Sequence, residues 1–236
     1  MTKIINLISS PRTISTALMY SFAQRTDTKV VDEPFYGYYL TKSKIEHPDH
    51  QGIINVMETN PEKIIKTIFN YQKQPVLFLK NMAHHLIEMD LSFLKKMVNL
   101  FLIRDPQKLI ASFARVIPNP KATDIGVKKQ FELFKMLDKH NPLVLDSNEV
   151  LKDPPKVLQQ LCEKLAIPFD PNMLSWTAGP IKEDGIWAKN WYKNVHASTG
   201  FGKPSANSIK LPERLRELSK SSKDYYNQLY HYSIKA

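Results

Sequence analysis

Short runs of apolar residues alternate with segments of helical periodicity along most of this chain, and this alternation restricts its fold more than any other feature. Short apolar runs are typical of strands that are buried on both faces of a parallel sheet. The clearest are Ile4–Ile8, Val76–Leu79, Leu100–Ile103 and Leu143–Leu145, with a weaker one at Lys29–Asp32. Strands that alternate with helices predict an α/β fold in which a parallel β-sheet is flanked by helices.

Helices are predicted where apolar residues recur at helical spacing. These segments are Ser15–Arg25, Pro61–Tyr71, Leu86–Met97, Gln107–Val116, Ala122–Lys139, Pro155–Ala166 and Pro212–Tyr232. Neither the strand nor the helix pattern continues through about 170–211, which predicts a long C-terminal loop region. Long loops without a core pattern are often functional. Because no linker or internal repeat interrupts the pattern, residues 1–236 are predicted to form a single domain.

The composition narrows the possible functions. A chain of 236 residues with 42% hydrophobic content suits one domain with a sizeable core. No apolar run is long enough to span a membrane, and the apolar N-terminal stretch is better explained as a first strand than as a signal peptide. Cys162 is the single cysteine, so no intrachain disulfide is possible and a cytoplasmic location is expected. The net charge of +10 fits an anionic partner, but charge alone does not distinguish nucleic acid from a small nucleotide.

The segment Ser9–Thr16 lies between the first predicted strand and the first predicted helix. Ligands of α/β sheets bind beyond the carboxyl ends of the strands, where a helix amino end offers free N–H groups to an anion. Arg12 adds a guanidinium that can grip two oxygens, and Ser15 or Thr16 adds a hydroxyl. An ordinary serine cap beside a surface arginine is the alternative. The glycine-rich loop of ordinary kinases and ATPases is absent, which argues against those enzymes.

Arg104 directly follows the predicted strand Leu100–Ile103, and a helix follows it in turn. Arg104 is therefore expected at the same sheet edge as Arg12, with Ser112 on the second turn of the new helix. An arginine and a serine in this arrangement can hold a second phosphate. The alternative is a surface ion pair between Arg104 and Asp105, next to a serine without function.

Lys80 and the pair His84-His85 follow the predicted strand Val76–Leu79. Lys80 can stabilise charge that develops on a bridging oxygen, and a histidine can act as a general base near neutral pH. Adjacent histidines have the wrong spacing for two ligands on one helix face, so no metal site is predicted.

Glu33 ends the weaker strand, and the following Pro34 favours an extended approach of the backbone. Aromatic residues come directly afterwards, at Phe35, Tyr36, Tyr38 and Tyr39. An acid among aromatic side chains can serve as a base. A structural carboxylate paired with Arg12 or with a lysine explains the same residues equally well.

Taken together, these residues resemble the sulfotransferase family that uses 3′-phosphoadenosine 5′-phosphosulfate. The loop Pro11–Thr16 is similar to the 5′-phosphosulfate loop of that family, although it lacks the glycine that is common there. Arg104 with Ser112 resembles the 3′-phosphate motif. The resemblance extends from Ile4 to about Ala166, and it implies a sheet-and-helix architecture like that of the P-loop nucleotide kinases.

Further residues carry the same resemblance. Lys80 and His84 resemble the lysine and histidine that cytosolic members carry after a strand, whereas Glu33 resembles the catalytic glutamate of other branches. The Arg-Lys-Gly sequence that is familiar near the C-terminus is missing. The candidates to replace it are Phe201-Gly202-Lys203, with Trp191-Tyr192-Lys193 as a second contributor.

The resemblance implies the transfer of a sulfuryl group from this nucleotide to a hydroxyl or amine. It assigns nucleotide binding to Arg12, Thr13, Ser15, Thr16, Arg104, Ser112 and Lys203. Arg12 would also stabilise charge on the leaving phosphate, and Lys80 would support the bridging oxygen. Either Glu33 or His84 would take the proton of the acceptor, and of the two we favour Glu33. The chemistry requires no metal, because cationic side chains and a helix end supply the positive field.

Two other classes of function are compatible with parts of the sequence. One is a kinase-like phosphotransferase with a degenerate loop, which the missing lysine of the glycine-rich loop disfavours. The other is a protein that binds a nucleotide without catalysis, or a basic protein that binds nucleic acid. Candidate motifs at several strand ends disfavour nucleic acid, and no membrane partner is expected. The expected partner is a small acceptor, and the aromatic residues favour one that is apolar or ring-bearing.

Overall fold

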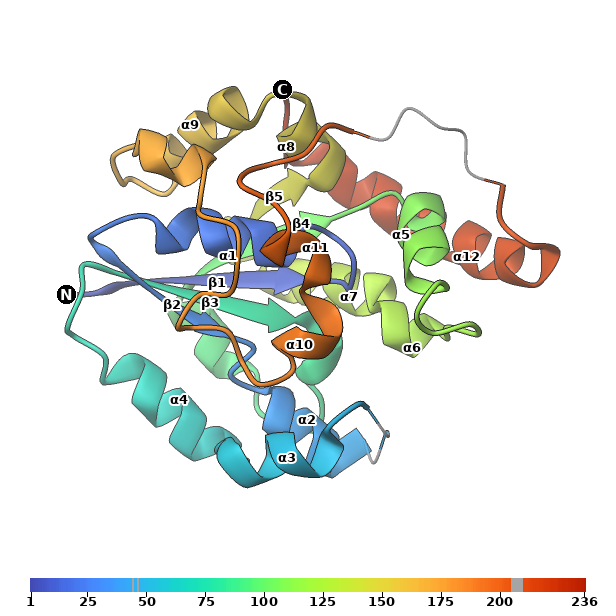
Figure 1. Cartoon of the computed structure of the whole chain (residues 1–236), viewed down its shortest axis with the longest axis horizontal. Helices are drawn as coiled ribbons and strands as arrows, with labels where there is room; N and C mark the ends of the chain where they lie inside the picture. The colour runs from blue at the N-terminus through green and yellow to red at the C-terminus, as the bar shows by residue number, and fades with distance from the viewer. Residues whose placement is uncertain (44, 46, 205–209) are drawn as a thin grey trace.

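The computed structural model describes residues 1–43, 45, 47–204 and 210–236. Its centre is a parallel sheet of six strands in the order β2-β3-β1-β4-β5-β6 (Figure 1). The strands are β1 (Lys3–Ser9), β2 (Thr28–Asp32), β3 (Val76–Met82), β4 (Val98–Ile103), β5 (Leu143–Asp146) and β6 (Ser233–Ile234). This arrangement confirms the predicted α/β fold with a parallel sheet flanked by helices. The short edge strand β6 was missed, because two residues carry no periodic pattern.

The described helices connect the strands and cover the sheet. The α-helices are α1 (Ser15–Ala23), α2 (Tyr36–Ser43), α3 (His50–Val56), α4 (Pro61–Phe69), α5 (Pro106–Phe113), α6 (Ala122–Ile125), α7 (Val127–Leu137), α8 (Ser147–Lys152), α9 (Pro154–Lys164), α10 (Ala188–Trp191), α11 (Lys193–His196) and α12 (Glu213–His231). The 3₁₀ helices are η1 (Ala83–His85), η2 (Ser92–Lys96), η3 (Asp138–His140) and η4 (Pro171–Leu174). None of these described helices is long and apolar enough to cross a membrane.

The core forms two layers, one on each face of the sheet. Successive side chains of a strand point to opposite faces, so neighbours such as Leu7 and Ile8 enter different layers. Helices α1 and α9 pack on one face, and α4, α7 and α12 pack on the other (Figure 1). Strand residues that are buried on both faces explain why the strands have unbroken apolar runs rather than an alternating pattern.

Two predicted helices were wrong in detail. The segment Leu86–Met97 is not a helix. Its chain turns at Glu88, which has a φ of 47°, and η2 is its only described helical part. The segment Ala122–Lys139 is broken at Gly126, where a φ of 64° separates α6 from α7. Helix α2 was missed because its tyrosines and polar residues give no clear apolar stripe, and α3 because seven residues are too few to show a helical period.

The carboxyl ends of the central strands meet at one edge of the sheet. Ser9 at the end of β1 is in register with Met82 of β3 and Leu102 of β4, and Asp32 of β2 is in register with Lys80. The loops that follow these strands therefore face the same space. Helices α10 and α11 pass across this edge (Figure 1).

The loop region at about 170–211 is more ordered than its pattern suggests. Its described part contains η4, α10 and α11, and an isolated antiparallel bridge joins Ser175 to Gly200. Trp176 and Trp187 are buried in the core layer that also contains α1 and α9, whereas Trp191 is only partly buried. The region is held by large side chains rather than by long helices.

Candidate functional site

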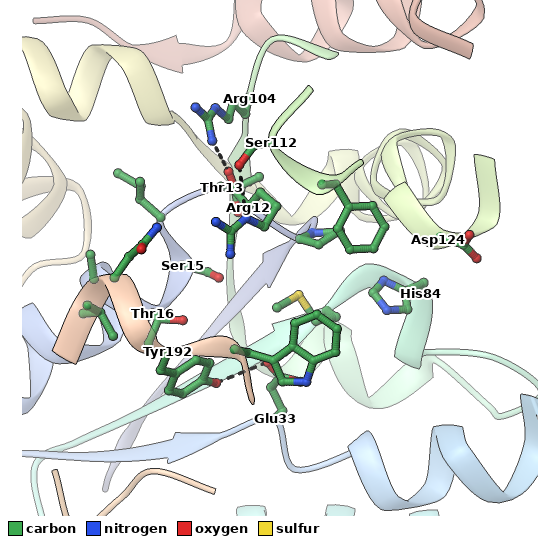
Figure 2. Close-up of a pocket in the computed structure, with 18 of the residues that line it drawn as sticks. Arg12, Thr13, Ser15, Thr16, Glu33, His84, Arg104, Ser112, Asp124 and Tyr192 are labelled. Carbon is green, nitrogen blue, oxygen red and sulfur yellow. Dashed lines mark hydrogen bonds between the residues drawn. The ribbon is translucent and has the colours of Figure 1, made fainter. Parts of the chain in front are cut away.

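A cavity of about 670 Å³ lies at the carboxyl edge of the sheet. Its walls come from the loop after β1, the ends of β2 and β3, helices α2 and α5, and the loop region with α10 and α11. Figure 2 shows Arg12, Arg104 and Ser112 gathered at one end and Glu33 with Tyr192 at another. We refer to the first as the arginine end and to the second as the glutamate end.

The loop after β1 follows a path that normally favours glycine. Arg12 and Ile14 have φ values of 63° and 61°, in the left-handed region where a side chain is strained. A hydrogen bond from another part of the chain holds the loop in place: the hydroxyl of Ser147 donates to the carbonyl oxygen of Thr13 at 2.8 Å. The chain thus forms this turn without glycine, at a cost in backbone strain that is typical of ligand-binding loops.

The amino end of α1 has no side-chain cap. Its N-cap residue is Ile14, which has no polar side chain to accept from the first N–H groups. By contrast, α4, α5 and α9 begin at Asn60, Asp105 and Asp153, whose side chains accept these bonds. Ser15 and Thr16, in the first turn of α1, line the cavity. The amino end of α1 therefore faces the cavity with N–H groups that no N-cap side chain satisfies, an arrangement that favours an anion.

Two arginines converge on the arginine end. The Arg12 Nε donates to Ser112 Oγ at 3.1 Å, and the Arg104 Nη1 donates to the carbonyl oxygen of Arg12 at 2.5 Å. Burial lowers the pKa of Arg12, with a further contribution from Arg115; burial followed by the charge of Arg12 lowers the pKa of Arg104. Both guanidiniums stay protonated near neutral pH. They make the arginine end electropositive.

The carboxylate next to Arg104 does not neutralise it. Asp105 caps α5 by accepting from the Gln107 and Lys108 backbone N–H groups, and its Oδ2 pairs with Lys223 Nζ at 2.5 Å. The sequence left open an ion pair between Arg104 and Asp105. Among the described residues Asp105 pairs with Lys223, and no ion pair joins Asp105 to Arg104. Arg104 therefore remains available to an anion.

The other expected nucleotide-binding residues differ in position. Thr13 lies at the cavity but is fully buried, and its hydroxyl donates to the Ser10 carbonyl oxygen at 2.7 Å. Its hydroxyl thus supports the loop. Lys203 is exposed and does not line the cavity, although the adjacent Phe201 and Gly202 do.

Lys80 lies behind the cavity wall. Its side chain is fully buried, and its Nζ donates to Asp32 Oδ1 at 2.9 Å, Glu33 Oε1 at 2.5 Å and Tyr192 Oη at 2.6 Å. Burial lowers its pKa, but the charges of Asp32 and Glu33 outweigh this and hold the pKa above its usual value. All three ammonium protons have partners. This departs from the expectation that Lys80 contacts a bridging oxygen.

Asp32 and Tyr192 belong to the same cluster, and the sequence did not predict that they come together with Lys80. The Tyr192 hydroxyl lies 2.8 Å from both carboxylate oxygens of Asp32, and Trp187 Nε1 donates to Tyr192 Oη at 3.1 Å. Burial raises the pKa of Asp32 to about 6. The one signal in the sequence is that Asp32 precedes Glu33 at a strand end. No pattern in the sequence links Tyr192, which lies in the loop region, to Asp32 or Lys80.

The two histidines of η1 take different positions. His85 is stacked on Tyr36 and Tyr39, with ring centroids 4.9 and 4.6 Å away, and its Nδ1 lies 3.9 Å from Glu33 Oε2. His84 packs edge-on against Tyr39 at 5.2 Å and lines another part of the wall. Burial lowers the pKa of both histidines well below the usual value, so both are neutral near pH 7. The sequence singled out His84, but His85 is the histidine next to Glu33.

The fold and this cavity define a parallel α/β protein with a cavity lined by two arginines at the carboxyl edge of its sheet. A family model described as a sulfotransferase domain matches residues 2–231. The chain therefore belongs to the sulfotransferase domain family, which is a family of transferases.

Two curated proteins of Arabidopsis thaliana are similar in sequence. Branched-chain-amino-acid aminotransferase-like protein 1 is 37% identical over 231 residues, and the match covers 96% of this chain and 41% of that protein. Protein 2 of the same name is 34% identical, with the same coverage. The chain thus spans about two-fifths of the length of these relatives, and their names describe longer proteins.

Solved structures are similar in fold. A sulfotransferase from Alicyclobacillus acidocaldarius superposes with a TM-score of 0.57 at 10% identity, covering 99% of this chain and 98% of that one. The sulfotransferase domain of the curacin biosynthetic pathway superposes with a TM-score of 0.55 at 16% identity, covering 94% and 97%. At these identities the likeness shows the shared fold.

Proposed function

We propose that this chain transfers a sulfuryl group from 3′-phosphoadenosine 5′-phosphosulfate to a hydroxyl or amine of a small acceptor. The observation that carries the proposal is the arginine end of the cavity. There an uncapped helix amino end and two arginines, neither paired with a carboxylate among the described residues, surround one space. Such a site suits a ligand with more than one anionic group. Membership of the sulfotransferase domain family supports the choice of a phosphosulfate.

The residues at the cavity fit this nucleotide. The free N–H groups of α1 and the Arg12 guanidinium suit the 5′-phosphosulfate, and Arg104 with Ser112 suits the 3′-phosphate. A volume of about 670 Å³ lies in the range of small-molecule sites and leaves room for an acceptor beside a nucleotide. When bound, the nucleotide supplies an activated sulfuryl group. Arg12 and the amino end of α1 then stabilise negative charge as it develops on the leaving phosphate.

Glu33 is the general base in this proposal. It lines the cavity, it is buried, and one of its oxygens is held by Lys80 while the other stays on the cavity side. Lys80 carries one positive charge against the two carboxylates of Asp32 and Glu33, so the cluster keeps a net negative charge that suits proton uptake. His84 is neutral and lines the cavity, but its ring packs against Tyr39 and His85, and His85 is the histidine that lies near Glu33, so His84 is the weaker candidate.

The acceptor in this proposal is a ring-bearing or apolar molecule. The glutamate end of the cavity is walled by Tyr36, Tyr39 and Trp191, with His47 packed between the tyrosines and the tryptophan. Aromatic walls bind flat apolar groups through offset or edge-on contact.

Calorimetry with four ligands tests the donor. We expect 3′-phosphoadenosine 5′-phosphate to bind at least tenfold more tightly than adenosine 5′-phosphate, because charge-assisted hydrogen bonds to the 3′-phosphate contribute about 1.5–3 kcal/mol each. ATP with magnesium and short DNA serve as competitors for the kinase-like and nucleic-acid alternatives. Equal affinity for the two adenosine phosphates would overturn the assignment. Transfer from labelled donor to a panel of acceptors then identifies the acceptor.

A further inference from the structure

The two oxygens of the Glu33 carboxylate have different surroundings. Oε1 accepts from Lys80 Nζ at 2.5 Å, whereas Oε2 lies 3.9 Å from His85 Nδ1. A separation of 3.9 Å is too long for a direct hydrogen bond, but one oxygen or nitrogen atom placed between the two can bond to both. Glu33 and His85 both line the cavity, so the two side chains border the space that a ligand would occupy.

The Nδ1 atom of His85 is buried and has no hydrogen-bond partner among the described residues. The side chain is only 2% exposed, and its ring is held between Tyr36 and Tyr39, with interplanar angles of 2° and 26°. Buried polar atoms in folded proteins nearly always have a partner. A buried, fixed and unpaired nitrogen beside a cavity therefore indicates a position that a ligand atom completes.

Lys80 determines which oxygen of Glu33 is free. Its three donors are engaged by Asp32, Glu33 and Tyr192, so it has none left for the cavity. Its bond to Oε1 leaves Oε2 as the proton-accepting atom. The nearby negative charge also favours the His85 tautomer with its proton on Nδ1, since that proton points toward Oε2.

From this geometry we infer that Glu33 Oε2 and His85 Nδ1 together hold the attacking atom of the acceptor, and that Lys80 is a positioning residue. The inference rests on the proposed sulfuryl transfer. The His85 N–H donates to one lone pair of the acceptor oxygen, and the acceptor hydroxyl donates to Oε2. As a bond forms from that oxygen to sulfur, the proton moves to Oε2. The bond from sulfur to the bridging oxygen breaks, and its electron pair stays with the phosphate of the nucleotide. Glu33 later releases the proton to solvent.

Two substitutions at His85 distinguish the contribution of the Nδ1 atom from that of ring packing. His85→Phe keeps an aromatic ring between Tyr36 and Tyr39 but removes Nδ1, whereas His85→Asn places an amide donor near the position of Nδ1. Tyr20→Phe is the matched control: it removes a buried hydroxyl that bonds to Asp184 at 2.6 Å, outside the cavity. Three acceptors are tried with the wild type, 2-naphthol, 1-octanol and benzylamine, and the best of them is used throughout. Slow hydrolysis of the donor provides a readout that needs no acceptor, because water then takes the acceptor position.

We expect His85→Phe to lower both the acceptor kcat/KM and the donor hydrolysis by about tenfold or more, and His85→Asn to recover part of the loss. Calorimetry provides a readout without turnover. In the complex with 3′-phosphoadenosine 5′-phosphate, the acceptor should bind several-fold more weakly to His85→Phe, while the affinity for the nucleotide stays within twofold. Tyr20→Phe should behave as wild type in all three measurements.

The outcomes distinguish the two proposals. If the wild type transfers sulfuryl groups and His85→Phe remains within twofold of it in every readout, the two-point acceptor site is wrong while the proposed function stands. A loss that His85→Asn does not reduce at all would assign His85 to packing alone and overturn the inference. If the wild type neither transfers a sulfuryl group nor hydrolyses the donor, the proposed function fails and the acceptor site fails with it.

Discussion

The two ends of the cavity use positive charge in opposite ways. At the arginine end, Arg12 and Arg104 are half-buried, and most of their guanidinium N–H groups have no protein partner among the described residues. At the glutamate end, Lys80 is fully buried and all of its protons are engaged. The difference teaches that a cation near a site is a ligand-binding group only where the fold leaves its donors free.

Backbone geometry follows the same division. The arginine end has an uncapped helix and two residues in the left-handed region, a backbone geometry that favours an anionic ligand. The glutamate end has a satisfied network of Lys80, Asp32, Tyr192 and Trp187, which fixes one carboxylate oxygen and leaves the other. Substitutions at the first should alter binding and charge stabilisation; substitutions at the second should alter proton transfer and stability.

The largest expected effect is that of Glu33→Gln. Removal of a general base costs about 10²–10⁴-fold in turnover, and the amide keeps the size of the side chain. Binding of 3′-phosphoadenosine 5′-phosphate should not change, because Glu33 lies at the other end of the cavity. Turnover at saturating donor and calorimetry measure the two quantities.

His84→Ala is the comparison for this substitution, and it should be milder. If His84→Ala instead abolishes turnover and Glu33→Gln does not, the base is His84. Loss of nucleotide binding in Glu33→Gln would show that the two ends of the cavity are coupled. Near-wild-type turnover in both variants would mean that neither residue is the base.

Lys80→Met tests how much the buried hydrogen-bond network around Lys80 contributes to the free energy of unfolding. Removal of one partner of a buried ion pair leaves unpaired charge in the interior and typically costs about 3–5 kcal/mol. Here it leaves Asp32 and Glu33 together without their cation. The free energy of unfolding in urea measures the loss, and a chain that fails to fold agrees with the expectation.

Lys29→Met is the matched control. Lys29 pairs with Glu183 at 3.1 Å, but its side chain is 40% exposed, so its loss should cost no more than about 1 kcal/mol. Equal losses in Lys80→Met and Lys29→Met would show that the buried network does not stabilise the fold, and the assigned positioning role of Lys80 would then lack support.

Arg12→Ala tests whether the arginine end contributes more to turnover than to ground-state binding. Because the proposed reaction places developing charge of the leaving phosphate beside Arg12, the loss of this side chain should lower turnover by about 10²–10³-fold and weaken ground-state binding less. Arg12→Lys should recover only part of the activity, since an ammonium cannot replace the planar guanidinium. Steady-state kinetics at saturating donor decide the point, and unchanged turnover in Arg12→Ala would contradict the role.

The sequence predicted the fold and the arginine end well because both depend on local patterns. Apolar runs define the strands, and the loop at Ser9–Thr16 and the position of Arg104 follow from where those strands end. The sequence did not show that the loop without glycine carries backbone strain; this follows from the left-handed φ values of Arg12 and Ile14. Polar residues at strand ends thus indicate a site before any tertiary contact is known.

The glutamate end was predicted poorly because it depends on long-range contacts. Tyr192 lies 160 residues from Asp32 in the chain, and no period or motif links them. The choice between His84 and His85 turns on the direction of a three-residue 3₁₀ helix, and a histidine pair gives no indication of which ring faces Glu33. Whether Lys80 has free donors is a property of the packed network, which sequence patterns do not encode.

The smallest expected effect is that of Ser112→Ala, and it separates two roles of one hydroxyl. Ser112 Oγ accepts from Arg12 Nε at 3.1 Å, and it is also the expected partner of the 3′-phosphate. A hydrogen bond to a charged phosphate contributes about 1.5–3 kcal/mol, so 3′-phosphoadenosine 5′-phosphate should bind about ten- to 150-fold more weakly. Adenosine 5′-phosphate should bind as before, and the exposed Ser221→Ala provides the control. If the affinities for both nucleotides fall equally, Ser112 acts by orienting Arg12, and the 3′-phosphate then depends on Arg104 without Ser112.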